Sequence, residues 1–251
     1  MSVYYFSMLK NYEILDAELG KIAINLSKRA RRISFRGENG AITAIIPHNY
    51  RGNIEYLQRL INENRAALKR LLNKSASRHE SSMLYDGKRI EIVEGTLTLR
   101  ADCNIGRGRV RSCKGRDGIT FLFHPDDLLS TSFQQGLVRY IMRTLTTHYG
   151  ATLRQMIYEQ ATQLGIELKD VRLGRGQRIL GHCSRSGIIT VSSFVLLLPH
   201  HLRQYIINHE LAHLTHFNHS PAFHTLCNEY CQGNEAPWVK ELRNFHFPIS
   251  L

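Results

Sequence analysis

Hydrophobic and polar positions alternate in two stretches of the chain, residues 12–46 and 83–124. In the first stretch the alternating apolar positions are Ile22, Ile24 and Leu26, followed by Ile33 and Phe35. Successive side chains of a β-strand point to opposite faces, so this period is typical of strands with one buried face. The pattern predicts a group of short β-strands in each stretch.

Between these two groups of strands, and again after them, apolar residues recur with the spacing typical of helices. Residues 52–73 carry apolar side chains three and four positions apart with charges between them, which predicts one amphipathic helix, and residues 74–82 are predicted to be a polar linker. Residues 130–164 predict one long helix, or two with a break near Gly150. Further elements are expected as a short strand within residues 174–181, an edge strand at 187–191, and helices at about 200–217, 221–232 and 237–244. These elements predict an α+β fold, and no internal repeat is evident.

The helix expected at about 200–217 contains His209, Glu210 and His213 in a His-Glu-x-x-His arrangement. Residues four apart on a helix lie on one face, so both histidines can hold one metal ion. Glu210 can reach a metal-bound water as a general base. A chance match is the competing reading, because the chain has 13 histidines.

His219 is the predicted third ligand, and it requires the helix to end before it. Asn218 tolerates the left-handed conformation that ends helices, while Ser220 suits an N-cap and Pro221 the first turn of a following helix. Two histidines and one further ligand leave a zinc position open, as a catalytic site needs. Glu229 and Glu235 are the alternative third ligands.

Charge and cysteine content bear on location and partners. The formal net charge is +12, yet only three basic and four acidic residues follow position 199, so the excess lies in the N-terminal part. This asymmetry favours an anionic partner such as nucleic acid, with plain solubility as the alternative. Five cysteines without framework spacing, no recognisable signal peptide and no run of about 18 apolar residues favour a cytoplasmic protein without a membrane span.

A cluster of arginines is the candidate contact for such a partner. Arg107, Arg109 and Arg111 would share one face if their segment were a strand. Three guanidinium groups in a row suit phosphates, and a solvated strand face is the alternative.

The segment Ile207–Leu214, followed by Asn218–Phe223, resembles the YgjP-like family of predicted metal-dependent hydrolases, relatives of the SprT-like proteases. The family's Trp-Gly-Ser-Cys-Ser segment has its counterpart in Leu180–Ser184, with Leu180 for Trp and His182 for Ser. A third departure is Ser192-Ser193-Phe194, where an Asn-Trp-Arg run is common in the family. These departures leave the predicted metal-binding histidines intact and affect residues that would contact the substrate.

The resemblance implies a zincin-like metallopeptidase domain. We therefore expect residues 1–129 to form a β-rich part with one amphipathic helix, and residues 130–251 to form the zincin-like catalytic part. The predicted enzyme uses Zn²⁺ held by His209, His213 and His219, with Glu210 activating the zinc-bound water, to cleave peptides or proteins, including those associated with nucleic acid. The strand at 187–191 would pair with an extended peptide.

Two other function classes stay open at this point. One is a metal-dependent hydrolase of a non-peptide substrate such as a nucleotide phosphate, and the other is a nucleic-acid-binding protein with a structural zinc. The oligomeric state is not indicated by any pattern in the sequence.

Overall fold

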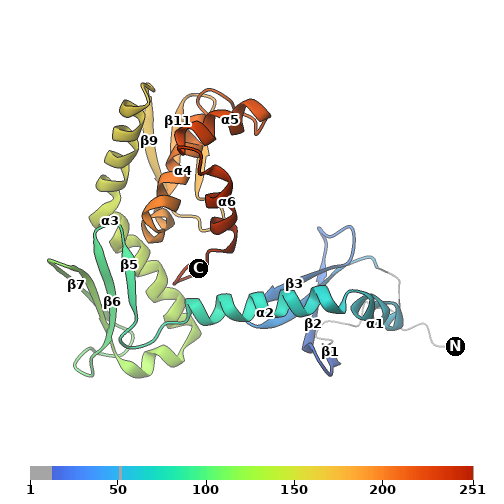
Figure 1. Cartoon of the computed structure of the whole chain (residues 1–251). Helices are drawn as coiled ribbons and strands as arrows, with labels where there is room; N and C mark the ends of the chain where they lie inside the picture. Colours follow the sequence, from blue (N-terminus) through green and yellow to red (C-terminus); the bar gives the residue numbers. More distant parts are fainter. Residues whose placement is uncertain (1–12, 51–52, 251) are drawn as a thin grey trace. The chain divides into compact units, whose positions relative to one another are not determined.

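The computed structural model describes residues 13–50 and 53–250 (Figure 1). The chain divides between Met83 and Leu84 into two compact units. Both units combine strands and helices, so the α+β class is confirmed.

The first unit is a four-stranded sheet with two helices. Its strands are β1 (Glu13–Asp16), β2 (Gly20–Ser27), β3 (Ser34–Glu38) and β4 (Ala41–Pro47). They lie in the order β1-β2-β4-β3, with β2 and β4 parallel and the two outer pairs antiparallel. Ile22, Ile42 and Ile46 are completely buried in this unit's core. Of the alternating positions predicted to face the core, Ile22 and Ile24 are buried, and Leu26, Ile33 and Phe35 are partly buried against it.

Two helices follow this sheet, where the sequence predicted one helix and a linker. Helix α1 spans Ile54–Glu63 and α2 spans Arg65–Ser82. The linker prediction for residues 74–82 is wrong, because these residues continue α2. Ser75 on α2 is buried and its hydroxyl accepts a hydrogen bond of 3.0 Å from the backbone N–H of Gly40. This tertiary contact packs α2 against the sheet, and a distant contact of this kind is not visible in the composition of the segment.

The second unit begins with a sheet of the same topology. Its strands are β5 (Arg89–Ile92), β6 (Gly95–Ala101), β7 (Val110–Gly115) and β8 (Gly118–Phe123). Their order is β5-β6-β8-β7, again with a parallel central pair and antiparallel outer pairs. The two sheets therefore repeat one strand arrangement, although the sequence shows no repeat. A sheet requires only apolar alternation and turns at matching places, which different residues can supply.

A single long helix, α3 (Thr131–Gln163), follows a short 3-10 turn, η2 (Pro125–Leu129). The break considered near Gly150 does not occur. A Cβ atom at Gly150 would lie 2.7 Å from Cδ1 of Leu173, so the glycine allows close packing of α3 on strand β9 (Asp170–Gly174). Figure 1 shows β9 running beside one end of α3.

The third sheet is small and has the order β10-β11-β9, with β10 at Gly181–Cys183 and β11 at Ile188–Ser192. Strand β11 pairs antiparallel with β10 and parallel with β9. The prediction that residues 187–191 form an edge strand is therefore wrong. Strand β11 is the central strand of this sheet, and β9 and β10 are its two edge strands. The 3-10 turn η3 (Ser193–Leu197) then leads into α4 (His200–Ala212), and α5 (Pro221–Tyr230) and α6 (Glu235–Asn244) follow.

The second unit shares one hydrophobic core from β5 to the end of α6. Phe121 of β8, Leu145 of α3 and Phe194 of η3 are completely buried in it. The boundary expected after residue 129 falls inside this core, because strands β5–β8 contribute buried side chains to the same cluster as α3. Among the helices of the described residues, none has the length and apolar character required to cross a bilayer.

Candidate metal centre

Helix α4 carries the His-Glu-x-x-His residues and ends sooner than predicted. It stops at Ala212, and the backbone N–H groups of Thr215 and His216 both bond to the Ala212 carbonyl, at 3.1 and 3.0 Å. Asn218 does not adopt a positive φ, so its expected role in ending the helix is wrong. The turn after Ala212 satisfies the last carbonyl groups instead.

The chain then turns back through His219 into α5. The Ser220 hydroxyl accepts a 3.4 Å hydrogen bond from the N–H of Phe223, and Pro221 is the first helical residue. Both local predictions are confirmed. Asn208, beside His209 on α4, donates a 2.8 Å hydrogen bond to the carbonyl of Tyr230 at the end of α5. This bond fixes α4 to α5 on either side of the corner that holds His219.

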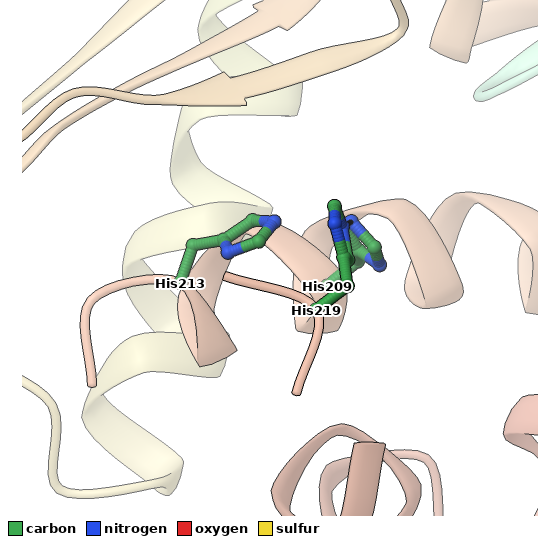
Figure 2. A group of neighbouring side chains, drawn as sticks. All are labelled: His209, His213 and His219. Atoms are coloured by element: carbon green, nitrogen blue, oxygen red, sulfur yellow. Dashed lines mark hydrogen bonds between the residues drawn. The ribbon is translucent and has the colours of Figure 1, made fainter. Parts of the chain in front are cut away.

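The three histidines come together above the end of α4 (Figure 2). One ring nitrogen from each of His209, His213 and His219 lies within 4.8 Å of the others. The ring centroids are 4.8 Å apart for His209 and His213, 5.1 Å for His209 and His219, and 4.7 Å for His213 and His219. Zinc–nitrogen bonds of about 2.0–2.1 Å would place the ligand atoms of one ion about 3–4 Å apart, and the 3.1 Å between Nε2 of His209 and Nε2 of His219 lies in this range.

Two of the histidines have partners that orient their rings. Nδ1 of His209 lies 3.2 Å from the Tyr205 hydroxyl, and Nδ1 of His213 lies 2.9 Å from the backbone carbonyl of His216. A carbonyl only accepts, so the second contact requires a proton on Nδ1 of His213 and leaves its Nε2 free to bind a metal. Burial, and then the neighbouring histidines, lower the pKa of His209 to about 3, so this ring is neutral, as a metal ligand must be.

Glu210 has a buried carboxyl group with an unusual environment. Its side chain is 4% exposed, and among the described residues its Oε2 is the buried side-chain oxygen without a hydrogen-bond partner. Burial raises the pKa of Glu210 to about 8. A buried carboxyl oxygen without a partner, one position along α4 from His209, fits a centre where a metal and a polar reactant are to be bound.

Strand β10 covers this carboxyl group. A Cβ atom at Gly181 would lie 2.2 Å from Oε1 of Glu210, so only glycine fits there without moving the carboxyl group. Burial, together with Glu210, raises the pKa of the neighbouring Cys183 thiol to about 11, which keeps it protonated. The contacts of Gly181 and Tyr205 could not be predicted from the sequence. A glycine before His182 does not indicate a metal site, and the sequence shows only that Tyr205 lies one helical turn before His209.

The alternative third ligands lie outside the histidine group. Glu235 is buried and its Oε1 lies 2.7 Å from Nδ1 of His224. Glu229 is exposed on α5. The group of potential ligands found among the described residues contains His219 and neither glutamate.

The arginine cluster predicted near residue 110 does not form one strand face. Arg107 and Arg109 precede β7, and only Arg111 lies on it. Arg107 is paired with Asp126, which neutralises one of the three charges. The shared strand face considered for these three arginines is therefore not formed.

Similarity to known proteins identifies the family of this chain. The family model of the YgjP-like metallopeptidase domain matches residues 31–244, most of the chain. The chain belongs to the YgjP-like family. Membership in this metallopeptidase family implies a metal ion and a peptide or protein substrate, and the three histidines could bind that ion. Leu180 and His182, the departures noted from the family pattern, lie before and within β10.

A search of curated proteins found no match. Among solved structures, the metallopeptidase zymogen abylysin of Pyrococcus abyssi shares 25% identity, with a TM-score of 0.30. The match covers 36% of this chain and 95% of the zymogen.

Proposed function

We propose that this YgjP-like protein is a zinc-dependent, zincin-like metallopeptidase. The observation that carries the proposal is the convergence of three histidine nitrogens within 4.8 Å, with the buried carboxyl group of Glu210 next along the helix. A set of imidazole ligands favours zinc over magnesium or calcium, which prefer oxygen. His209, His213 and His219 would hold the ion.

Zinc, when bound, supplies Lewis-acid polarisation of the scissile carbonyl and of the attacking water. Glu210 accepts the proton of that water at its unpartnered Oε2 and later donates it to the leaving amine. Burial favours this role because it raises the pKa of Glu210 toward neutrality, where a group can both take and give a proton. Tyr205 and the His216 carbonyl hold two imidazoles in fixed orientations throughout.

Substrate binding would use the edge strand β10. Along one side, Gly181, His182 and Cys183 of β10 pair with β11. An extended peptide can add to an exposed strand edge through backbone hydrogen bonds, which suits substrates of varied sequence. Because Gly181 contacts Glu210, a peptide along β10 would pass beside the proposed base.

The test is cleavage of unfolded protein and peptide substrates by the purified full chain. We expect new amine termini to appear with zinc present, to stop with a chelator, and to reappear on adding zinc back. Nucleoside triphosphates serve as the competing substrate class. Hydrolysis of triphosphates without any peptide cleavage would overturn the peptidase assignment in favour of the alternative hydrolase.

Gly181→Ala is expected to impair hydrolysis without removing the metal. The added Cβ cannot coexist with Glu210 Oε1 at 2.2 Å, so the carboxyl group must move by about 1 Å. Such a displacement of a reacting group costs up to about 10²-fold in rate. Gly176→Ala is the matched control, because a Cβ there contacts nothing within 4 Å. Equal activity of the two variants in a peptide-cleavage assay would contradict the proposed position of the base.

A further inference from the structure

A groove on the exposed side of α3 is lined by arginines and by no acidic side chain. It consists of two cavities of about 490 and 430 Å³ that share Thr146 and Arg175. We name it the arginine groove after the four arginines that line it: Arg139, Arg143, Arg154 and Arg175. It contains none of the three histidines or Glu210, so it is separate from the proposed catalytic residues.

The charge of the groove is not neutralised locally. All four arginines are exposed, and none forms an ion pair with an acid among the described residues. The sequence explains this. No acidic residue occurs between Asp127 and Glu159, the stretch that provides the α3 wall, or between Asp170 and Glu210, the stretch that provides the opposite wall. Two long acid-free segments thus face each other across a concave surface, which concentrates positive potential.

The shape of the groove is fixed by hydrogen bonds. The Thr146 hydroxyl of α3 bonds to the Ser193 hydroxyl of η3 at 2.8 Å, and the Ser193 hydroxyl bonds to the carbonyl of Gly174 at the end of β9 at 2.9 Å. These two bonds join the three elements that form the walls. The groove is therefore preformed, so a ligand would not have to order it.

The lining also offers flat surfaces. The guanidinium of Arg143 lies 5.3 Å from the ring centre of Tyr140, and the Tyr140 hydroxyl lies 3.1 Å from that of Ser112 on β7. Tyr140 packs edge-to-face on buried Phe121, with centroids 5.9 Å apart. Guanidinium planes and aromatic rings are the surfaces on which unstacked bases pack.

We propose that the arginine groove binds single-stranded nucleic acid. Its lining residues run from Gly136 to Arg154, which on a helix is about 27 Å and matches an extended polyanion rather than one small anion. Arginines match phosphate geometry, and the concave part containing Tyr140 and Met142 can receive an unpaired base. A duplex keeps its bases stacked inside and cannot use that part of the surface.

The first test measures the affinity of the full chain for a labelled oligothymidylate by fluorescence anisotropy at several salt concentrations. In the variant Arg139→Gln, Arg143→Gln and Arg175→Gln, we expect weaker binding and a log–log salt slope flattened by about 2, since each contact to a single strand contributes about −0.7. The control removes three exposed positive charges elsewhere in the same unit, at Arg89, Arg100 and Arg116. It should keep the wild-type slope, and an equal slope change in both variants would overturn the assignment to this groove.

A second pair of variants tests the groove without removing any arginine. A Cβ at Gly136 contacts nothing within 4 Å, so Gly136→Glu and Gly136→Gln should both fold. They differ only in charge, and the glutamate should bind oligothymidylate at least about tenfold more weakly because it repels phosphate. Equal affinities would overturn the proposal. The proposal would also be overturned if the protein bound polyglutamate but not oligothymidylate, or if it bound duplex DNA more tightly than the single strand.

Discussion

Glu210→Gln is expected to abolish peptide hydrolysis while the protein keeps its metal. Glutamine preserves the size and polarity of the side chain but cannot accept the proton of the attacking water. A positioned proton-transfer group contributes about 10²–10⁴-fold, so we expect turnover to fall by at least about 10²-fold. Because both zinc and substrate contacts would remain, the loss should be in kcat, with little change in KM. Steady-state cleavage of a fluorogenic peptide measures both.

The pKa of Glu210 provides a check that this variant is folded. Burial raises the pKa of the carboxyl from 4.5 to about 8 in the metal-free protein. An acid with a raised folded-state pKa stabilises the fold below its unfolded value, and this advantage is lost as pH rises through the folded pKa. Above about pH 8 the wild type bears the full cost of a buried charge, which glutamine lacks. Metal-free Glu210→Gln should then unfold at the same or a higher temperature than the wild type at pH 9. Normal turnover in a variant that passes this check would exclude Glu210 as the base.

Local signals in the sequence predicted much of the candidate site. The four-residue spacing of His209 and His213, with Ser220 and Pro221 opening the next helix, led to the expectation that His219 turns back toward them, and the structure brings all three rings together. These features depend on neighbours in the chain, which a sequence displays directly. The N-cap and the proline act within one helical turn, so no distant contact could override them.

Features that depend on distant residues were missed. The sequence predicted a strand at residues 187–191 but could not show that β9 and β10 flank it, so its predicted edge position was wrong. Likewise the polar composition of residues 74–82 suggested a linker, while these residues continue α2, which contacts the sheet through Ser75 and Gly40. The arginine groove combines α3 with residues from β9 and η3, and only the folded chain assembles it.

His219→Ala is expected to remove the metal as effectively as losing either histidine of α4. His219 is exposed, so its truncation should leave the fold intact. Its Nε2 lies 3.1 Å from Nε2 of His209, within the range for two ligands of one ion. Loss of an outer-shell partner alone weakens metal binding by about 10–100-fold, so losing a direct ligand should cost at least about 100-fold. Zinc content after dialysis against a competing chelator measures this.

Thermal unfolding in zinc gives an independent measure of the same loss. A ligand that binds only the folded state stabilises it by about 2.7 kcal/mol at a hundred times its Kd, so a hundredfold loss of affinity at that zinc concentration removes nearly all of this stabilisation. His216→Ala is the matched control, because His216 contacts the centre through its backbone carbonyl and an alanine keeps that group. It should retain zinc and the zinc-dependent rise in Tm. If His219→Ala also retains both, while Glu229→Ala or Glu235→Ala loses them, the third ligand is a glutamate and the corner formed by Ser220 and Pro221 serves only the fold.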